Sequence, residues 1–539
     1  MRSFNRLRAR MTPAAVALLA LTALVLGPTP VSAAAAACPG TQSDIDVNGD
    51  GYDDAVVGDP YASVNGQAQA GAIVVLYGDA DCRIGQGARR LVTQATAGVP
   101  GTAEAGDHFG WSVAVDDLSG DGRADIVVGT PGEDVGPLTD AGSLHVISFA
   151  AGSATSSISA VSFIQNQLGS PAEAGDQLGY SVAAADAGGD EAGSRAAAGA
   201  PGEDVGGAVD AGVVDTFGFD GAWQRGGEFH QGLTGAPSFL ALPGTPESGD
   251  RFGANLLIAQ LNAPFTGDVL AGPEWTYVIG APGDTVAGHP GAGSVSLAYT
   301  QTWAHEQVSQ DSPGVPDAAE SGDGFGASLA IDETRGWVGR GASTTDVGTE
   351  QRDLAVGAPG EDVGSAADAG SVTLFRSQLD GLHAQTALTQ DTLGFAGRPE
   401  TGDRFGSSVA MRPAVTGQDP LLVIGVPSED IGTVSDAGLV QTATVSDHEV
   451  TAQRSYSESS PGTPGSVGSG HRFGLTVAAM QGRAETLFAI SSPYAGAGSV
   501  FLVDQQGQER SWVPGVDGVP KPAGAGRFGW SVAGLESTY

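Results

Sequence analysis

Short runs of aliphatic and aromatic residues, each bounded by glycine or proline, make up most of the hydrophobic pattern after residue 33. One run begins at Val127 and ends in Gly129-Thr130-Pro131, and another follows Ala141-Gly142. β-branched and aromatic residues favour extended backbone, whereas Gly and Pro end it, so such runs predict short strands joined by tight turns. The pattern therefore predicts an all-β protein.

A phrase that starts with a large apolar residue and glycine returns seven times. Its copies begin at Phe109, Leu178, Phe252, Phe325, Phe405, Phe473 and Phe528. Their glycines lie 69, 74, 73, 80, 68 and 55 residues apart. A fixed phrase at unequal spacing indicates one repeated scaffold unit with loops of variable length. We expect the phenylalanines to be wedges packed between units.

Each unit has further landmarks in a fixed order. An aliphatic run ends in Gly-Ala-Pro or a close variant, Ala-Gly then leads into a second run, and a less regular run such as Phe163-Ile164 follows. Four strands per unit, repeated seven times, are typical of a propeller. The sequence therefore predicts a seven-bladed β-propeller of four-stranded antiparallel blades.

The two ends of the chain each carry part of a unit. Residues 55–60 and 70–75 supply the middle landmarks with no Phe-Gly phrase before them, and the chain ends with the phrase at Phe528 alone. Pairing of the N- and C-terminal strands in one blade would remove open sheet edges. We predict that this composite blade closes the ring, with the C-terminal strand innermost.

Two nine-residue loops have oxygen-bearing side chains at positions 1, 3, 5 and 9, and a sharp turn at Gly51 or Gly122. Ca²⁺ takes six to eight hard oxygen ligands around a tightly curled backbone. The expected ligands are Asp46, Asn48, Asp50, the Tyr52 carbonyl and Asp54 in the first loop, and Asp117, Ser119, Asp121, the Arg123 carbonyl and Asp125 in the second.

The two loops occupy the same place in neighbouring blades, which favours calcium over the alternative of metal-free Asp/Gly turns. Ser119 replaces a carboxylate or amide, so the second site should be the weaker one. Residues 186–190 and Asp332-Glu333 look like decayed copies that we expect not to bind tightly. We predict two Ca²⁺ sites that lock the closure of the ring.

The combination of Phe-Gly, a calcium-type loop and Gly-Ala-Pro resembles the FG-GAP repeats of integrin α-subunit head domains and related bacterial proteins. The resemblance covers nearly all of the chain after the leader, although the sixth full repeat has Ser491-Ser492-Pro493 where Gly-Ala-Pro is expected. It implies the propeller fold, calcium at the loop positions named above, and a role as an extracellular binding or adhesion module.

Acidic turns recur in two places in the repeat. The first follows the second strand, as in Glu133-Asp134 with Asp140, and the second precedes each Phe-Gly phrase, as in Glu104 with Asp107. Antiparallel strands place both turns on one face and the calcium loops on the opposite face. This acidic face is a candidate binding surface for an extracellular protein, a glycan or cations. The alternative is that the carboxylates shape the turns by accepting backbone hydrogen bonds.

Residues 1–33 have the pattern of a secretory signal peptide, with four arginines, an apolar run over residues 14–26 and Val31-Ser32-Ala33 at the cleavage position. Residues 34–539 then form one propeller domain with 20 basic and 62 acidic residues, a net charge of −42. That charge argues against nucleic acid and anionic membranes as partners. A secreted monomer without membrane insertion is the simplest interpretation.

The chain has two cysteines, Cys38 and Cys82. Export and an even count favour a disulfide between them. The alternative is a lipoprotein anchored at Cys38, because residues 35–38 loosely resemble a lipobox.

Catalytic motifs are missing from the sequence. It has no G-x-S-x-G elbow and no HExxH motif, and His108 and His471 are expected to be exposed loop residues. Carboxylates that recur in every blade do not single out one acid/base pair. We therefore expect no enzyme. The alternatives to a calcium-binding extracellular module are a calcium-stabilised structural scaffold and an extracellular polysaccharide-acting enzyme.

Overall fold

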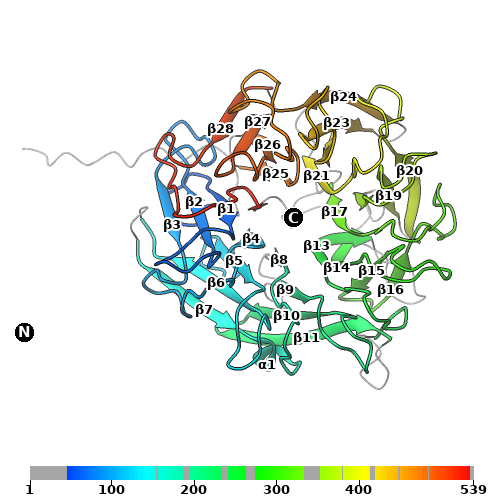
Figure 1. The fold of residues 1–539 in the computed structure, drawn as a ribbon. Helices are drawn as coiled ribbons and strands as arrows, with labels where there is room; N and C mark the ends of the chain where they lie inside the picture. Colours follow the sequence, from blue (N-terminus) through cyan, green and yellow to red (C-terminus); the bar gives the residue numbers. More distant parts are fainter. Residues whose placement is uncertain are drawn as a thin grey trace, which may run out of the picture. The chain divides into compact units, whose positions relative to one another are not determined.

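Twenty-nine strands and one short helix form the regular structure of the described residues. The computed structural model describes residues 45–152, 156–185, 195–232, 241–262, 273–332, 352–378, 380–412, 419–446, 449–482, 485–504 and 506–533. All of them belong to one structural unit, residues 38–539. The strands form seven sheets, and the sheets are the blades of a ring (Figure 1).

The blade that joins the chain ends, called the closing blade below, has the strand order β29 (Ser531–Val532), β1 (Ala55–Asp59), β2 (Ala72–Leu76) and β3 (Arg89–Val92). The next three blades contain β4 (Val113–Asp116), β5 (Asp125–Thr130), β6 (Ser143–Phe149) and β7 (Ile158–Phe163); β8 (Ser181–Ala185), β9 (Arg195–Ala200), β10 (Val213–Phe219), β11 (Trp223–Gln231) and β12 (Ala241–Leu242); and β13 (Asn255–Asn262), β14 (Pro273–Ala281), β15 (Ser294–Tyr299) and β16 (His305–Val308).

The last three blades contain β17 (Ser328–Ile331), β18 (Arg352–Ala358), β19 (Ser371–Gln378) and β20 (Gly381–Leu388); β21 (Ser408–Arg412), β22 (Leu421–Val426), β23 (Leu439–Val445) and β24 (Val450–Tyr456); and β25 (Val477–Gln481), β26 (Thr486–Ser491), β27 (Val500–Asp504) and β28 (Glu509–Trp512). The predicted fold class is confirmed. One blade departs from four strands, because β12 adds a fifth that runs parallel to β11. The helix α1 (Gln165–Leu168) follows β7.

Closure by the two chain ends is present as predicted. Val57 pairs with Val532 and Gly58 with Ser531 in antiparallel register, so β29 is the innermost strand of the closing blade. In Figure 1 the red C-terminal strand accordingly meets the blue N-terminal strands.

The middle strands of each blade are buried on both faces because each blade is covered by a neighbour on either side. Every residue of β1 and β2 is buried, whereas the outer strand β3 is largely half-buried or exposed. This explains why the middle strands are continuous apolar runs such as Ala-Ile-Val-Val-Leu rather than alternating ones.

The large apolar residue of each phrase packs between two blades. All seven are at most 1% exposed: Phe109, Leu178, Phe252, Phe325, Phe405, Phe473 and Phe528. Each belongs to a hydrophobic cluster that joins its blade to the preceding one, and there are seven such junctions around the ring. Burying one phenylalanine contributes about 1.5–3 kcal/mol. The predicted wedges are therefore confirmed.

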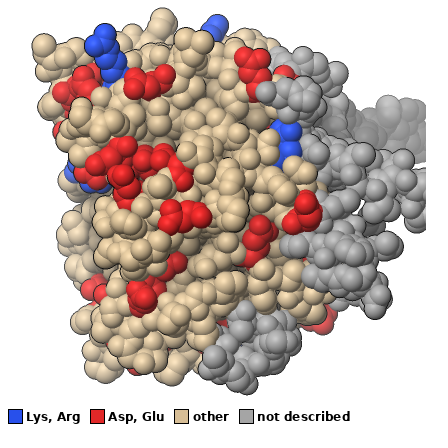
Figure 2. All heavy atoms as spheres, turned by 90° about the vertical axis from the view of Figure 1, so that its right-hand side faces the viewer, with Lys and Arg blue, Asp and Glu red and all other residues tan. Residues whose placement is uncertain are grey.

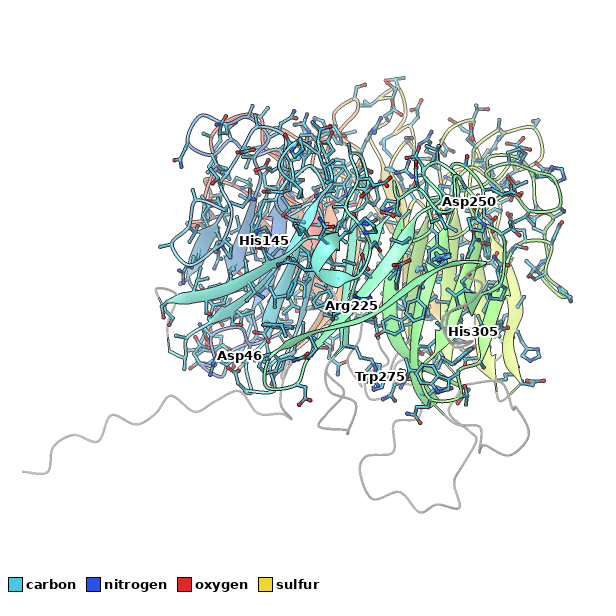
Figure 3. All side chains as sticks on the ribbon, turned by 90° about the horizontal axis from the view of Figure 1, so that it is seen from below. Asp46, His145, Arg225, Asp250, Trp275 and His305 are labelled. Atoms are coloured by element: carbon cyan, nitrogen blue, oxygen red, sulfur yellow. The ribbon has the colours of Figure 1, made fainter. Side chains whose placement is uncertain are left out.

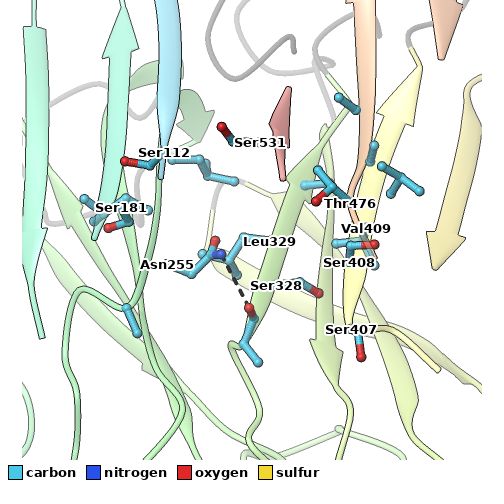
Figure 4. Close-up of a pocket in the computed structure, with 18 of the residues that line it drawn as sticks. Ser112, Ser181, Asn255, Ser328, Leu329, Ser407, Ser408, Val409, Thr476 and Ser531 are labelled. Atoms are coloured by element: carbon cyan, nitrogen blue, oxygen red, sulfur yellow. Dashed lines mark hydrogen bonds between the residues drawn. The ribbon is translucent and has the colours of Figure 1, made fainter. Parts of the chain in front are cut away.

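A ring of hydrogen bonds runs around the inner strands, and Figure 4 draws the one that Asn255 donates. In each blade the polar residue two positions after the glycine of the phrase donates to a main-chain carbonyl of the next blade. The bonds are Ser112 Oγ to Gly179 O, 2.8 Å; Ser181 Oγ to Gly253 O, 2.6 Å; Asn255 Nδ2 to Ala327 O, 3.4 Å; Ser328 Oγ to Gly406 O, 2.7 Å; Ser408 Oγ to Gly474 O, 2.9 Å; Thr476 Oγ1 to Trp530 O, 2.7 Å; and Ser531 Oγ to Gly110 O, 2.9 Å.

The glycine of the Gly-Ala-Pro landmark allows this close approach. A Cβ atom on Gly357 would lie 2.2 Å from Gly406 O and 2.2 Å from Ser328 Oγ. Gly406 itself has φ 83°, a left-handed conformation that glycine adopts without steric cost. The two glycines that define the repeat therefore meet at the junction between neighbouring blades.

Candidate functional site

The first predicted calcium loop is a curled turn held by its own carboxylates. Asp46 accepts hydrogen bonds from the backbone N–H groups of Gly49 (2.8 Å) and Gly51 (2.9 Å), and Asn48 Oδ1 accepts from Asp50 N (2.8 Å). Asp54 accepts from Val47 N at 3.0 Å, which ties the last residue of the loop to its start. The loop therefore brings Asp46, Asn48, Asp50 and Asp54 around one short stretch of backbone.

Burial opposes the ionisation of the carboxylates in this loop. Asp46, Asn48 and Asp54 are at most 2% exposed. Burial, together with the charges of Asp46 and Asp50, raises the pKa of Asp54 well above its usual value. Carboxylates that repel one another in a buried loop are stabilised by a bound cation.

The second loop is curled in a similar way around its own carboxylates, and it also contains an arginine. Asp117 accepts from Asp121 N (3.1 Å) and Gly122 N (2.8 Å), and Asp125 accepts from Ser119 N (2.8 Å). Burial raises the pKa of Asp125 to about 6. The Arg123 guanidinium pairs with Asp121 within the loop, which neutralises part of its charge.

The two loops are in direct contact. Ala124 N donates to Asp46 O at 3.0 Å, and Gly152 N donates to Asn48 O at 3.0 Å. The Arg123 side chain crosses the first loop so closely that a Cβ on Gly49 would lie 2.9 Å from it. The decayed copy at 186–190 and Glu333 lie outside the described residues, whereas Asp332 is fully buried.

The donor set of the loops suits Ca²⁺, since it consists of carboxylate, amide, hydroxyl and main-chain oxygens. The Ser119 Oγ atom is buried without a hydrogen bond of normal geometry, although it lies near enough to Asp125 to lower that pKa slightly. Among the described residues no three His, Cys, Asp or Glu side chains are gathered as a metal site. A calcium site here would therefore depend on main-chain and neutral oxygens as well as on carboxylates.

The loops and the acidic turns lie at opposite faces, as predicted. Figure 3 shows Asp46 of the first loop at one face and Asp250, which precedes a Phe-Gly phrase, toward the other. On the face of the acidic turns, the turn of one blade contacts the turn of the next blade. Gly106 N donates to Ala68 O and His108 N donates to Gln69 O, each at 3.0 Å. Figure 2 shows carboxylates in several patches with few Lys or Arg between them.

Most acidic turn residues serve the turns themselves. The aspartate of each Glu-Asp pair accepts from the backbone N–H of a later aspartate at 2.9–3.0 Å: Asp134 from Asp140, Asp204 from Asp210, Asp362 from Asp368 and Asp430 from Asp436. Before the phrases, Asp107, Asp250, Asp323 and Asp403 accept from a glutamate N–H three residues earlier at 2.5–2.6 Å. These bonds favour the turn-shaping interpretation over a cation site.

The glutamate of each pair contacts a buried glutamine from the end of the preceding blade. Gln94 Nε2 donates to Glu133 at 2.6 Å, Gln390 Nε2 to Glu429 at 2.7 Å, and Gln310 Nε2 to Glu361. Burial raises the pKa of Glu133 and of Glu429 to about 7 and of Glu361 to about 8. The sequence did not predict these contacts, because each pair lies 39 or more residues apart.

The ring encloses a central cavity of about 770 Å³. Its wall is formed by the inner strands, and Figure 4 shows their polar residues, including Ser112, Ser328 and Thr476, around it. Five larger side chains line it at the acidic-turn face: Trp111, Tyr180, Arg251, Arg404 and Trp530. We call these five residues the channel mouth.

Aromatic rings gather at the channel mouth, which the sequence analysis missed. Trp111 lies 4.8 Å from Trp530 and 5.5 Å from Tyr180 between ring centroids. The signal is present in the phrase, because the residue after Phe-Gly or Leu-Gly is aromatic in these three adjacent blades alone.

The expectation that two histidines are exposed is wrong, since both are half-buried. His108 packs 5.6 Å from the Trp111 ring, and burial lowers its pKa. His471 Nδ1 lies 2.7 Å from the buried Glu458 carboxylate. These contacts account for the partial burial of both histidines.

The leader and Cys38 lie outside the described residues, so the signal peptide, the disulfide and the lipid anchor stay predictions. Cys82 is described, in the loop between β2 and β3. Within the described ranges, no helix combines the length and apolar character that a membrane crossing needs.

This geometry defines a class of protein, the closed seven-bladed β-propeller. The large apolar residues of the repeated phrase are wedged between its blades, and acidic loops precede β1 and connect β4 to β5. A family model of the FG-GAP repeat matches residues 109–147, from the Phe109 wedge to the end of the second aliphatic run. This segment is thus similar to an FG-GAP repeat, and the ring of seven blades is consistent with a propeller of the integrin α type.

Solved structures show a more distant likeness. BBS1N in complex with ARL6DN, soaked with lead, has a TM-score of 0.38 and 11% identity, covering 77% of this chain and 85% of that one. The periplasmic gluconolactonase PpgL of Pseudomonas aeruginosa has a TM-score of 0.40 and 12% identity, covering 88% and 98%. No curated protein matches the chain in sequence. At these TM-scores neither structure bears on function.

Proposed function

We propose that the chain is a secreted, calcium-binding propeller that acts as an extracellular binding module. The observation that carries the calcium part is the hydrogen bond from Ala124 N to Asp46 O, which fixes two loops of matching oxygen donors side by side. One loop leads into the closing blade and the other belongs to the next blade. Calcium would therefore act at the joint where the ring closes.

The residues that would hold calcium are Asp46, Asn48, Asp50, Asp54 and the Tyr52 carbonyl in the first loop, and Asp117, Ser119, Asp121, Asp125 and the Arg123 carbonyl in the second. The ion supplies a positive charge that offsets the repulsion between buried carboxylates. Ser119 and the Arg123–Asp121 ion pair leave the second site with less negative charge, so it binds more weakly.

A binding role without catalysis is favoured by the way the carboxylates are used. The same hydrogen bonds recur in blade after blade, so the acidic turns hold the loops in place rather than form one catalytic pair. The channel mouth differs, because its aromatic residues come from only three of the blades. The ligand site therefore belongs at the channel mouth rather than on the acidic turns.

Export accounts for the remaining features. The apolar leader would be removed, and an oxidising compartment would allow Cys38 to pair with Cys82. The pair would tie the mature N-terminus to the β2–β3 loop of the closing blade. Mass spectrometry of the exported chain separates this disulfide from a lipid on Cys38.

Thermal unfolding with and without calcium tests the metal part. At calcium 100-fold above Kd, a site stabilises the fold by about 2.7 kcal/mol. For a domain of this size we expect the Tm to rise by about 2 °C or more over a sample in chelator. An unchanged Tm, with no heat of binding in calorimetry, would contradict the calcium proposal.

Exposure of the immobilised exported protein to glycan and peptide panels tests the binding part. Retention of a defined ligand, lost on substitution at the channel mouth, supports it. Release of cleaved or eliminated sugar products from a polysaccharide panel would instead establish an enzyme.

A further inference from the structure

Arginines gather at one position of the repeat. The residue just before the large apolar residue of the phrase is Arg251, Arg404, Arg472 or Arg527 in four of the seven copies. These are four of only 20 basic residues in a chain with 62 acidic ones after the leader. Two of the four, Arg251 and Arg404, line the central cavity.

The backbone at this position does not call for arginine. Arg251, Arg404 and Arg472 have φ of 55°, 60° and 56°, a left-handed conformation that costs a residue with a Cβ about 1 kcal/mol. Gly324 takes the same place in another blade with φ 66°. The arginine side chains, rather than the turn, therefore account for these residues.

Three of these arginines have no carboxylate partner among the described residues. Within the part of the chain that the structure describes, Arg251, Arg404 and Arg472 form no ion pair. Arg251 instead lies over the Tyr180 ring, with its Cζ atom 5.5 Å from the centroid. A guanidinium stacked on a ring keeps the N–H groups at its edge available to an anion.

The aromatic rings form a continuous arc beside the arginines. Tyr61 lies 5.2 Å from Trp530, which lies 4.8 Å from Trp111, and Trp111 lies 5.5 Å from Tyr180. All four side chains are half-buried, so each presents part of its ring. Arg404 lines the same cavity from a blade on another side of the ring.

The combination selects the chemistry of the ligand. A pyranose ring has an apolar C–H face that packs on an aromatic ring, and hydroxyls at its edge that bond to polar groups such as those around the cavity. Arginine binds a carboxylate or sulfate through two parallel N–H···O bonds. A cavity of about 770 Å³ accepts a unit of this size.

The negative charge of the acidic turns limits the number of anionic groups that a ligand of the channel mouth can carry. Exposed carboxylates of the acidic turns, among them Glu104, Asp134 and Asp140, lie on the same face of the ring as the channel mouth. They would repel a long polyanion, whereas one anionic unit inside the cavity is close to the arginines and screened from the rim.

We propose that the channel mouth binds a single anionic sugar unit at the end of a glycan, stacked on Trp111 and Tyr180 and paired with Arg251 and Arg404. This inference rests on the proposed role as a binding module and names its ligand class. Carboxylate and sulfate are the two sources of charge that fit the arginines.

The test uses the exported protein and oligosaccharides ending in glucuronate, galacturonate, sialate or a sulfated sugar, each with its uncharged counterpart. Tryptophan fluorescence and calorimetry measure binding. We expect at least one acidic member to bind about 10-fold or more tightly than its neutral counterpart, and more weakly as salt is added. The carboxylate and sulfate arms show which group is recognised.

Matched variants locate the site. Arg251→Gln, Arg404→Gln and Trp111→Ala should each weaken binding about 10-fold or more. Arg398→Gln, an exposed arginine six residues before Arg404 that does not line the cavity, and Trp303→Ala, an exposed tryptophan in the β15–β16 loop, should leave it unchanged. Circular dichroism and Tm verify that each variant is folded.

Two results would contradict these proposals, and each has a different consequence. A neutral glycan or a peptide that binds equally well to wild type and Arg251→Gln overturns the anionic-sugar assignment but leaves the binding module standing. If no member of either panel binds the folded protein, both this inference and the proposed function fail.

Discussion

The Ser531 hydroxyl donates a hydrogen bond of 2.9 Å to Gly110 O, which joins residues 421 positions apart. Six bonds of the same kind join the other neighbouring blades, but each links residues only 54–78 positions apart. Among these seven bonds, the Ser531 bond is the one that crosses the place where the chain ends meet. It therefore completes a ring of contacts that the covalent chain leaves open.

Ser531→Ala should weaken this place selectively. One lost hydrogen bond lowers the free energy of unfolding by about 1 kcal/mol. The adjoining strand β29 has two residues, so its amides should exchange sooner than those of other inner strands. Hydrogen exchange should be faster for Gly529 N–H and Ala533 N–H, which donate to Gly58 O and Val56 O.

Ser408→Ala is the matched control, because it removes the same bond between two blades that the chain already links. It should lower stability by a similar amount without affecting exchange at β29. Equal exchange in both variants would mean that the junction of the chain ends is no weaker than the others.

Gly357→Ala should be one of the most destabilising small substitutions in the protein. The added Cβ would lie 2.2 Å from both Gly406 O and Ser328 Oγ, so either the blades separate or the hydrogen bond breaks. We expect a loss of about 3 kcal/mol in the free energy of unfolding, measured with denaturant.

Gly364→Ala separates this steric effect from backbone conformation. Gly364 has φ 66° and no atom within 4 Å of an added Cβ, so only the left-handed backbone opposes the substitution. That cost is about 1 kcal/mol. Equal losses in the two variants would contradict the proposed role of Gly357 at the blade junction.

Stability should fall as the pH rises toward 8 because of the buried glutamates between blades. Burial, with Asp317 and Asp323 nearby, raises the pKa of Glu361 to about 8 from an ordinary 4.5. The folded state then holds a proton that the unfolded state releases between these two values. Stability from this group is therefore full below about pH 4.5 and declines up to about pH 8, by at most about 1.4 kcal/mol per pH unit.

Glu361→Gln removes this titration while keeping the shape of the side chain. We expect a flatter dependence of Tm on pH between 5 and 8, and a higher Tm than wild type at pH 8. Glu449→Gln, at an exposed position, should leave the profile unchanged. A wild-type slope in Glu361→Gln would show that Glu361 is ionised in the fold.

The sequence was sufficient for the features that repeat in register. The Phe-Gly phrase predicted the wedge at Phe405 and the innermost strand at Ser531, because one local pattern fixes both the turn and the buried residue. The acidic turns were also visible, but not their partners. Gln310 and Glu361 lie 51 residues apart, across a loop of variable length, so no local spacing marks the pair.

The channel mouth was missed for a different reason. Trp111, Tyr180 and Trp530 differ in type at a position that elsewhere holds Ala254, Ala327, Ser407 or Leu475, so the repeat alone suggests a tolerant site. Only closure of the ring brings Trp530 beside Trp111, since the two lie at opposite ends of the chain. Calcium binding by the two loops remains a prediction, which rests on their sequence and on their geometry.

Arg123 provides a sharp test of the two calcium loops. Its guanidinium pairs with Asp121 in the second loop and would compete with calcium for that carboxylate. Arg123→Gln removes the positive charge but keeps the main-chain carbonyl, so the second site should bind calcium about 10-fold more tightly in calorimetry. Asp50→Asn should instead weaken the first, tighter site about 10-fold. Arg83→Gln, which breaks an exposed ion pair with Asp79, should change neither site. A weaker second site in Arg123→Gln would mean that the guanidinium supports the loop rather than competes with the ion.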